Sequence, residues 1–292
     1  MLNSTILDVA IGLIFTFLAV SLAVSSIVEA IASALKWRSA TLLQGVKDLL
    51  NDSNFTGLAR DLYNHALVNP RDPGTARTAD DMKNKPAYIN AQQFADAMID
   101  LTQIANAAPG QIKQAINANV ADPQLNSLLT GMVDRTGGTI HQMRQELAGW
   151  FDNAMDRVGG AYKRRTQVWS FFIALVMAAL LNVSAINVGR AMWQQPMLAR
   201  TVAPQAKLDA KSALHQLELL GALDVAIGWS QKEVDEFFTS WNWFDFIAGW
   251  LITAVATLFG APFWFDSLQQ IIRLKGSGPS PAEKSSSTGA AA

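Results

Sequence analysis

An uninterrupted apolar stretch near the start of the sequence constrains the fold more than any other feature. Residues 9–28 contain no charged side chain. About 20 such residues in a helix span the hydrocarbon core of a bilayer. Lys36, Trp37 and Arg38 close the stretch, and a basic cluster beside a tryptophan is typical of a cytoplasmic membrane boundary. The pattern predicts a transmembrane helix over residues 5–36 with its N-terminus outside.

Small residues occupy one face of this predicted helix. They recur at alternating steps of four and three, as Gly12, Thr16, Ala19, Ala23, Ser26, Ala30 and Ser33. Lipid supplies little hydrophobic force between helices, so close backbone approach through small residues drives their association. The spacing is that of a left-handed coiled-coil seam. We therefore expect this face to contact another helix, either within the chain or in a second copy.

Two further apolar stretches predict two more spans, at residues 168–188 and 244–265. Basic residues concentrate on the cytoplasmic side of a membrane and contact lipid headgroups there. At the predicted boundaries these residues are Lys36, Arg38, Lys163, Arg164, Arg165, Arg273 and Lys275. Their positions predict an outside N-terminus and an inside C-terminus.

Two polar residues in the predicted spans are candidate intramembrane sites. An ionisable residue inside a span, such as Glu29, is a functional candidate. Glu29 is also close enough to Lys36 to reach the cytoplasmic interface, and this second interpretation is favoured. The other candidate is Asn182, for which a hydrogen bond to a neighbouring helix is the more common role.

The residues between the first two spans predict a cytoplasmic helical domain, residues 37–167. Four helical segments, 91–108, 111–121, 123–136 and 139–158, are separated by Pro109-Gly110, Asp122-Pro123 and Gly137-Gly138. Apolar periodicity continues from the first span to about residue 51, which predicts one long helix. Residues 39–51 and 139–158 should then form an antiparallel stalk. The expected fold class is an all-α membrane protein with three transmembrane helices and this domain inserted between spans 1 and 2.

The remaining segments complete the expected organisation. Residues 189–243 predict an extracytoplasmic helical segment, and residues 266–275 an interfacial amphipathic helix. Residues 276–292 are rich in Gly, Ser, Pro and Ala, which is typical of a disordered tail.

Composition excludes several kinds of chemistry. The chain has no cysteine, which excludes disulfides, thiolate metal sites and a cysteine nucleophile. The three histidines, at positions 65, 141 and 215, have no metal-ligand spacing. We find no phosphate-binding or hydrolase motif, and a net charge of −1 gives no basic field for nucleic acid. We therefore expect no catalytic, cofactor or metal site, and no enzymatic activity.

Three stretches together are similar to a known family. They are residues 8–29, which begin Asp-Val-Ala-Ile-Gly-Leu-Ile-Phe, residues 150–165, and Ala-Pro-Phe-Trp-Phe-Asp at 261–266 with Leu-Lys-Gly-Ser-Gly at 274–278. These stretches resemble an uncharacterised family of bacterial inner-membrane proteins. The resemblance implies a bacterial inner membrane and carries over no functional residue.

Three functions fit these features. The first is a membrane scaffold or anchor that self-associates through the first helix and presents the cytoplasmic domain to a protein partner. The second is an oligomeric channel or membrane-perturbing effector, lined by Thr16, Ser21, Ser25, Ser26 and Glu29. The third is an accessory subunit of a transporter or enzyme complex. The expected partners are membrane lipids, further copies of the chain and a cytoplasmic protein, with no nucleic acid.

Overall fold

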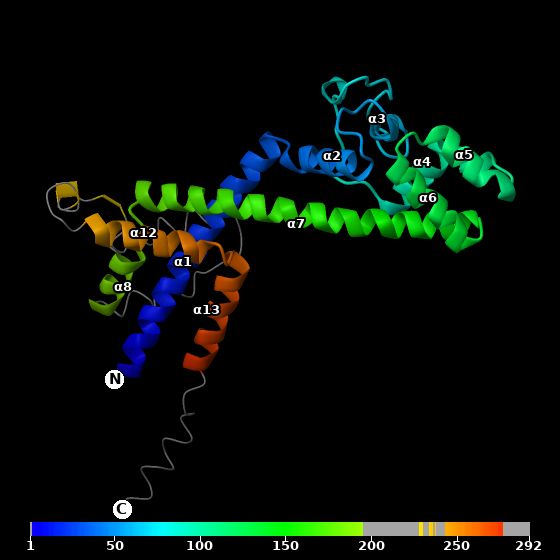
Figure 1. The fold of residues 1–292 in the computed structure, drawn as a ribbon. Helices are drawn as coiled ribbons and strands as arrows, with labels where there is room; N and C mark the ends of the chain where they lie inside the picture. The colour runs from blue at the N-terminus through cyan, green and yellow to red at the C-terminus, as the bar shows by residue number, and fades with distance from the viewer. Residues whose placement is uncertain (1, 195–227, 230–233, 236, 238–242, 277–292) are drawn as a thin grey trace, which may run out of the picture. The chain divides into compact units, whose positions relative to one another are not determined.

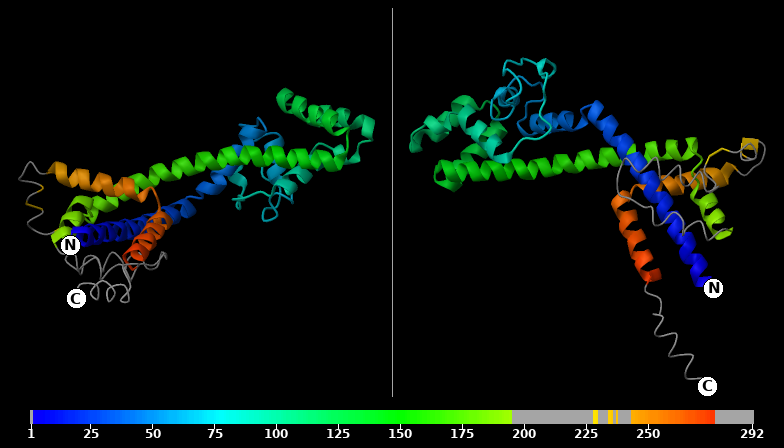
Figure 2. Two further views of the ribbon diagram at one scale, coloured as in Figure 1. Left: turned by 90° about the horizontal axis from the view of Figure 1, so that it is seen from below. Right: turned by 180° about the vertical axis from the view of Figure 1, so that it is seen from behind.

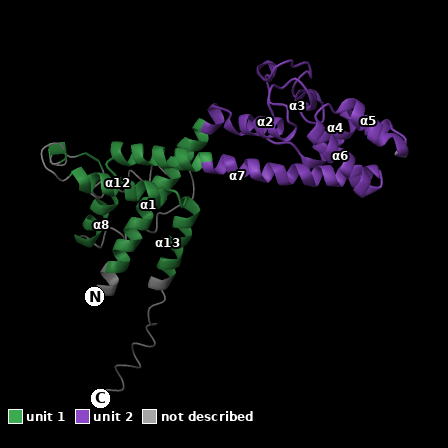
Figure 3. Cartoon of the chain, viewed as in Figure 1, with its two compact units in different colours: residues 1–31, 165–292 green, residues 32–164 purple. Residues whose placement is uncertain are grey.

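The computed structural model describes residues 2–194, 228–229, 234–235, 237 and 243–276. Every regular element in these ranges is a helix, as the sequence predicted (Figure 1). The chain divides into two compact units (Figure 3). Unit 2 is residues 32–164, and unit 1 combines residues 1–31 with residues 165–292. Most of the predicted extracytoplasmic segment and nearly all of the predicted tail lie outside the described residues.

The first helix is shorter than the sequence predicted. Helix α1 is Leu2–Ala34 and α2 is Trp37–Leu49. Lys36 separates them with a left-handed backbone, φ 50° and ψ 37°. The prediction of one helix to about residue 51 is therefore wrong. Periodicity records only the spacing of apolar residues, which continues across a break in the backbone.

Helix α1 is the centre of unit 1. Around it lie the last part of α7 (Ile140–Leu180), α8 (Ala185–Gln194), α12 (Trp243–Thr257) and α13 (Ala261–Gly276). Figures 1 and 2 show α1 between α8 and α13. The buried side chains of α1 include Ile11, Phe15, Leu18 and Leu22, and they form one core with Ala174, Met192, Ala254 and Leu268. A helix that is apolar on all sides is expected to be interior in this way.

The predicted second span is not one helix. Residues 181–184 separate α7 from α8, the two axes differ by 52°, and Asn182 has a positive φ of 47°. A break in apolar surroundings frees backbone groups that need new partners. The Thr253 hydroxyl of α12 supplies one, because it accepts a hydrogen bond from the Ala185 N–H at 3.1 Å. Gly249 permits this close approach, since a Cβ there would lie 1.9 Å from the Ser184 hydroxyl oxygen.

The predicted third span is also broken. Helix α12 ends at Thr257, and α13 begins at Ala261 with its axis turned by 94°. Gly260 adopts a positive φ of 82°, which glycine tolerates, and Pro262 stands in the first turn of α13, where no N–H partner is needed. Pro262 therefore belongs to the start of α13. The amphipathic segment 266–275 is the later part of α13, so it does not form a separate helix.

Unit 2 packs its short helices against α2 and the first part of α7. Its other elements are α3 (Leu58–Asn64), η1 (Ala79–Asp81), α4 (Ala91–Leu101), η2 (Ile104–Asn106), η3 (Pro109–Gln111), α5 (Ile112–Asn119) and α6 (Pro123–Thr136). They enclose one apolar core, in which the rings of Phe94 and Phe151 stack with centroids 4.2 Å apart. The segment predicted as one helix over residues 91–108 stops at Leu101, because Gln103 is left-handed with φ 60°.

Local capping sets the helix starts in this unit. Asp122 accepts a hydrogen bond from the Leu125 N–H at 2.7 Å, and Pro123 is the first residue of α6, as the sequence predicted. Asp52 fixes the start of α3 in another way. Its carboxylate accepts hydrogen bonds from four backbone N–H groups between residues 56 and 60, at 2.9 to 3.4 Å.

Candidate functional site

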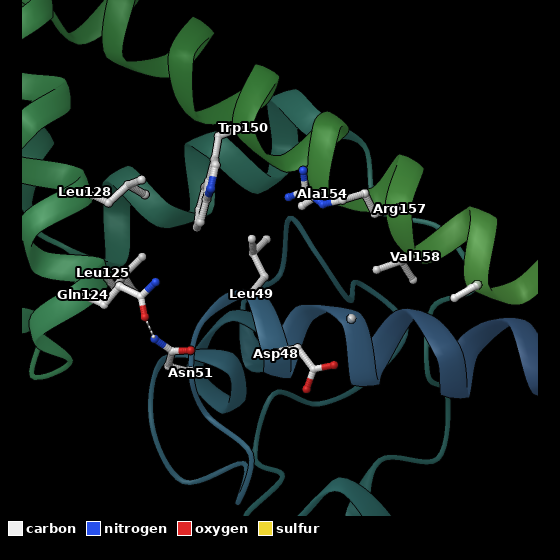
Figure 4. Close-up of a pocket in the computed structure, with 12 residues that line it drawn as sticks. Asp48, Leu49, Asn51, Gln124, Leu125, Leu128, Trp150, Ala154, Arg157 and Val158 are labelled. Carbon is white, nitrogen blue, oxygen red and sulfur yellow. Dashed lines mark hydrogen bonds between the residues drawn. The ribbon is translucent and has the colours of Figure 1, made fainter.

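An open cleft in unit 2 is the candidate functional site. It has a volume of about 450 Å³ and lies between α2, α6 and α7 (Figure 4). Its lining residues are Gly45, Asp48, Leu49, Asn51, Gln124, Leu125, Leu128, Trp150, Ala154, Arg157, Val158 and Ala161. A volume of this size falls in the range of pockets that hold a small ligand or a few large side chains.

A close contact between α2 and α7 lies toward one end of the cleft. The two helices run antiparallel, since Arg38 lies over the Tyr162 ring at 5.9 Å while Gly45 meets Val158. A Cβ on Gly45 would lie only 2.5 Å from a methyl carbon of Val158. Glycine therefore allows the helix backbones to touch at this point. Figure 4 shows the two helices diverging from this contact, and the cleft lies between them.

The walls of the cleft are apolar. Figure 4 shows Trp150 of α7 and Leu49 of α2 on opposite sides of the gap, with Leu125 and Leu128 of α6 at one end. The indole of Trp150 packs against the ring of Phe94, at a centroid distance of 6.1 Å. A partly exposed tryptophan with leucines around it is typical of the centre of a protein-binding surface.

Polar groups form the rim. Arg157 of α7 and Asp48 of α2 are both exposed, and the Asp48 carboxylate accepts a hydrogen bond from the Gln44 amide at 2.7 Å. At the α6 end, the Asn51 amide donates to a carboxylate oxygen of Asp122 at 3.2 Å and to the Gln124 side chain at 3.1 Å. This rim offers a cation and an anion to a bound segment.

Hydrogen bonds also stabilise the ionised form of Asp122 at the α6 end of the cleft. The Leu125 N–H and the Asn51 amide donate to the Asp122 carboxylate and lower the pKa of that carboxyl group below its ordinary value. The bond from Asn51 to Asp122 also holds the start of α6 to the residues that follow α2.

The small-residue face of α1 lies partly inside unit 1. Gly12, Thr16, Ala19 and Ala23 are buried, Ser26 is half-buried, and Ala30 and Ser33 are exposed. A Cβ on Gly12 would lie 2.6 Å from two side-chain atoms of Met192, so α8 covers the face at that point. The contact at Gly12 is therefore between helices of one chain.

The two candidate intramembrane polar residues have different surroundings. Glu29 is exposed. Asn182 is fully buried, its amide donates to the Gly228 carbonyl at 3.0 Å, and its side-chain oxygen accepts from the Trp250 indole at 3.2 Å. These bonds satisfy polar groups at the break between α7 and α8, which is a structural role.

The basic residues at the predicted boundaries are exposed where the structure describes them: Lys36, Arg38, Lys163, Arg164, Arg165 and Arg273. The side chain of Lys275 lies outside the described part. Within that part, no three His, Asp or Glu residues are grouped so as to hold a metal ion. The expected lack of a cofactor and of catalysis stays a prediction.

The cleft itself was missed by the sequence analysis. Its one usable signal was Gly45, because an isolated glycine inside a helical pattern often marks a close backbone approach or a functional position. Comparison with protein-family models, curated proteins and solved structures gives no match to this chain.

Proposed function

We propose that this protein is an integral membrane anchor that presents unit 2 to a protein partner, which binds in the cleft. Unit 1 is the part embedded in the bilayer. The observation that carries the proposal is the distribution of exposed large apolar side chains between the two units.

Exposed apolar side chains concentrate on the outer helices of unit 1. They include Val168, Phe172, Val176 and Leu180 on α7, Leu251, Ile252, Val255 and Phe259 on α12, and Phe263 on α13. Leu180 is 67% exposed and Phe259 is 62% exposed. Each such side chain gains about 1.5–3 kcal/mol when it leaves water for an apolar medium. A surface of this kind supports contact with lipid.

Unit 2 has a different surface. Its exposed large apolar side chains, among the described residues 32–164, are Leu35, Leu67 and Tyr88. They are scattered along the sequence, which is ordinary for a domain in water. The contrast favours a bilayer around unit 1 and an aqueous compartment around unit 2.

The topology that we propose has three crossings, with the N-terminus outside and unit 2 inside a bacterial inner membrane. Residues 6–34 of α1 are long and apolar enough to cross. The second crossing combines the end of α7 with α8. The third needs α13 as well as α12, because the 15 residues of α12 rise only about 22 Å. The exposed cations Lys36, Lys163 and Arg164 support an inside position for unit 2.

Single-cysteine variants test this topology, since the natural chain has no cysteine that would react. Gln142→Cys reports on unit 2 and Lys275→Cys on the end of α13. With a membrane-impermeant maleimide on intact spheroplasts, both sites should label only after permeabilisation. Labelling of residue 142 in intact spheroplasts would overturn the topology. Labelling of residue 275 alone would make the bent pair α12 and α13 a re-entrant loop.

The partner that best fits the cleft is an amphipathic helix. Two antiparallel helices, α2 and α7, diverge to leave an apolar gap, and a third helix fills such a gap with one row of apolar side chains. Trp150 and Leu49 would contact that row. Arg157 and Asp48 would pair with an acidic and a basic residue of the partner.

Site-specific photo-crosslinking in cells tests the docking. A photoreactive amino acid at Leu128 should give one discrete crosslinked product, whereas the same group at the exposed Gln142 should not. Trp150→Ala should remove the product, and Gln145→Ala, on the exposed surface of the same helix, should retain it. Equal products from both positions, or a product insensitive to Trp150→Ala, would contradict docking in the cleft.

Self-association through α1 is not part of this proposal. Gly12, Thr16 and Ala19 already pack inside unit 1, so a second copy would have to displace helices of the same chain. A pore lined by α1 meets the same obstacle, since Thr16 and Ser21 are buried while Glu29 is exposed. A role as an accessory subunit is compatible with the cleft and would be one form of partner binding.

A further inference from the structure

Four basic residues lie close in sequence to the contact between Arg38 and Tyr162, at one end of unit 2. The Arg38 guanidinium lies 5.9 Å from the centroid of the Tyr162 ring, which joins the start of α2 to α7. Lys36 precedes Arg38 by two residues, and Lys163 and Arg164 directly follow Tyr162. All four basic side chains are exposed. We name these four residues the basic cluster.

The charge of the basic cluster is not neutralised by nearby residues of its own helices. No acidic residue occurs in residues 30–47 or 157–188. The ion pairs of the described residues involve other basic side chains. Four positive charges therefore face solvent at this end of the unit, and an anion is the complementary ligand.

The position of the basic cluster along the chain indicates the source of that anion. Val168, one helical turn after Arg164, is the first of the exposed apolar residues that continue to Leu180 on α7. These residues rise roughly 18 Å, close to the thickness of one leaflet of a bilayer. If this part of α7 is in lipid, Lys163 and Arg164 stand at the level of the headgroups.

We propose that the basic cluster binds the headgroup of an anionic phospholipid in preference to a zwitterionic one. Arginine guanidinium groups match the oxygens of a phosphodiester with paired hydrogen bonds, and lysines add positive charge. Tyr162 positions Arg38 through its ring. The inference rests on the proposed embedding of unit 1, and it adds a lipid specificity that membrane anchoring alone does not require.

The test measures which lipids stay bound to the full-length protein. The protein is purified in mild detergent with equal amounts of phosphatidylglycerol and phosphatidylcholine, and the bound lipids are counted by native mass spectrometry. One variant neutralises the cluster: K36Q, R38Q, K163Q and R164Q together. A matched control removes the same number of charges from the loop between α3 and α4: R71Q, R77Q, K83Q and K85Q together.

We expect the wild type and the control to retain mainly phosphatidylglycerol, and the cluster variant to lower the ratio of the two lipids roughly tenfold or more. An unchanged ratio in the cluster variant, or an equal fall in the control, would overturn the proposal. So would displacement of the lipid by millimolar inorganic phosphate, which would indicate a site for free anions. As a control, thermal unfolding of each variant checks that the fold is retained.

The result is separable from the proposed function. Retention of the protein in membranes after alkaline carbonate extraction tests the embedding of unit 1, and crosslinking at Leu128 tests the cleft. A protein that passes both tests but shows no lipid preference would overturn only the lipid proposal. A protein that carbonate extracts from the membrane would overturn the embedding.

Discussion

The contact between Gly45 and Val158 gives the sharpest test of how unit 2 is packed. A Cβ atom on Gly45 would lie 2.5 Å and 2.9 Å from the two methyl carbons of Val158. Valine is branched at Cβ and has few rotamers to which it can move. Gly45→Ala should therefore force α2 and α7 apart at this end of the cleft.

Two opposing effects determine how much Gly45→Ala changes the stability of the protein. Overpacking of this kind costs about 1–3 kcal/mol, whereas exchanging glycine for alanine inside a helix gains about 1 kcal/mol. Gly149→Ala in α7 is the matched control, because nothing lies within 4 Å of the position its Cβ would take. The gain in helix propensity is common to both variants. The difference in stability between them is then the cost of the clash, about 1–3 kcal/mol.

Thermal unfolding of the full-length protein in detergent, followed by tryptophan fluorescence, measures this difference. For a unit of this size, 1 kcal/mol corresponds to a change in Tm of roughly 4 °C. Gly45→Ala should thus melt roughly 4–12 °C below Gly149→Ala. Adding Val158→Ala should recover part of the loss, since it removes the clashing methyl groups. A Gly45→Ala protein that melts at or above Gly149→Ala would refute the close contact.

Three further predictions concern hydrogen bonds. Asp52→Ala should lower the free energy of unfolding by roughly 3 kcal/mol, because four N–H groups lose a charged acceptor. Urea unfolding monitored by limited proteolysis of unit 2 measures this loss. A loss below about 1 kcal/mol would contradict the prediction. The pKa of Asp122 is lowered in the folded state, so its stabilisation is present above the unfolded pKa and is lost as pH falls through the folded pKa. Asp122→Asn should therefore reduce the fall of Tm that the wild type shows below about pH 4. The same dependence of Tm on pH in the variant and the wild type would count against the hydrogen bonds to the Asp122 carboxylate. Thr253→Val removes the acceptor for the backbone N–H at the break between α7 and α8 and should cost about 1–3 kcal/mol. The Thr257 hydroxyl bonds only within its own helix, so Thr257→Val should change the Tm in nanodiscs much less. Equal shifts in Tm for the two variants would contradict the role assigned to Thr253 at the break.

Much of the helical structure could be predicted because its determinants are local. Asp122 and Pro123 start α6 through a side-chain cap and a residue that needs no N–H partner. Gly137 ends the same helix with a left-handed backbone, φ 58°. Such signals act within one helical turn, so they are visible in the sequence alone.

The breaks in the helices could not be predicted in the same way. Apolar residues continue through positions 181–184, and periodicity therefore favoured one span. A break there is stable because Thr253 and Trp250, about 70 residues further along the chain, supply partners for the freed polar groups. The decisive contacts are distant in sequence, and only the tertiary structure brings them together.

By itself, the sequence determined that this protein is helical and where its apolar segments lie, and it predicted a face of small residues on the first helix for close contact. The tertiary structure decided what covers that face: Met192 of α8 lies against Gly12, and the contact is within one chain. It also decided that α2 and α7 diverge beyond Gly45 to form a cleft. The physical reason is the same in both cases. A pattern of side chains specifies a surface through local geometry. Whether another segment covers that surface or leaves it open depends on how distant segments pack.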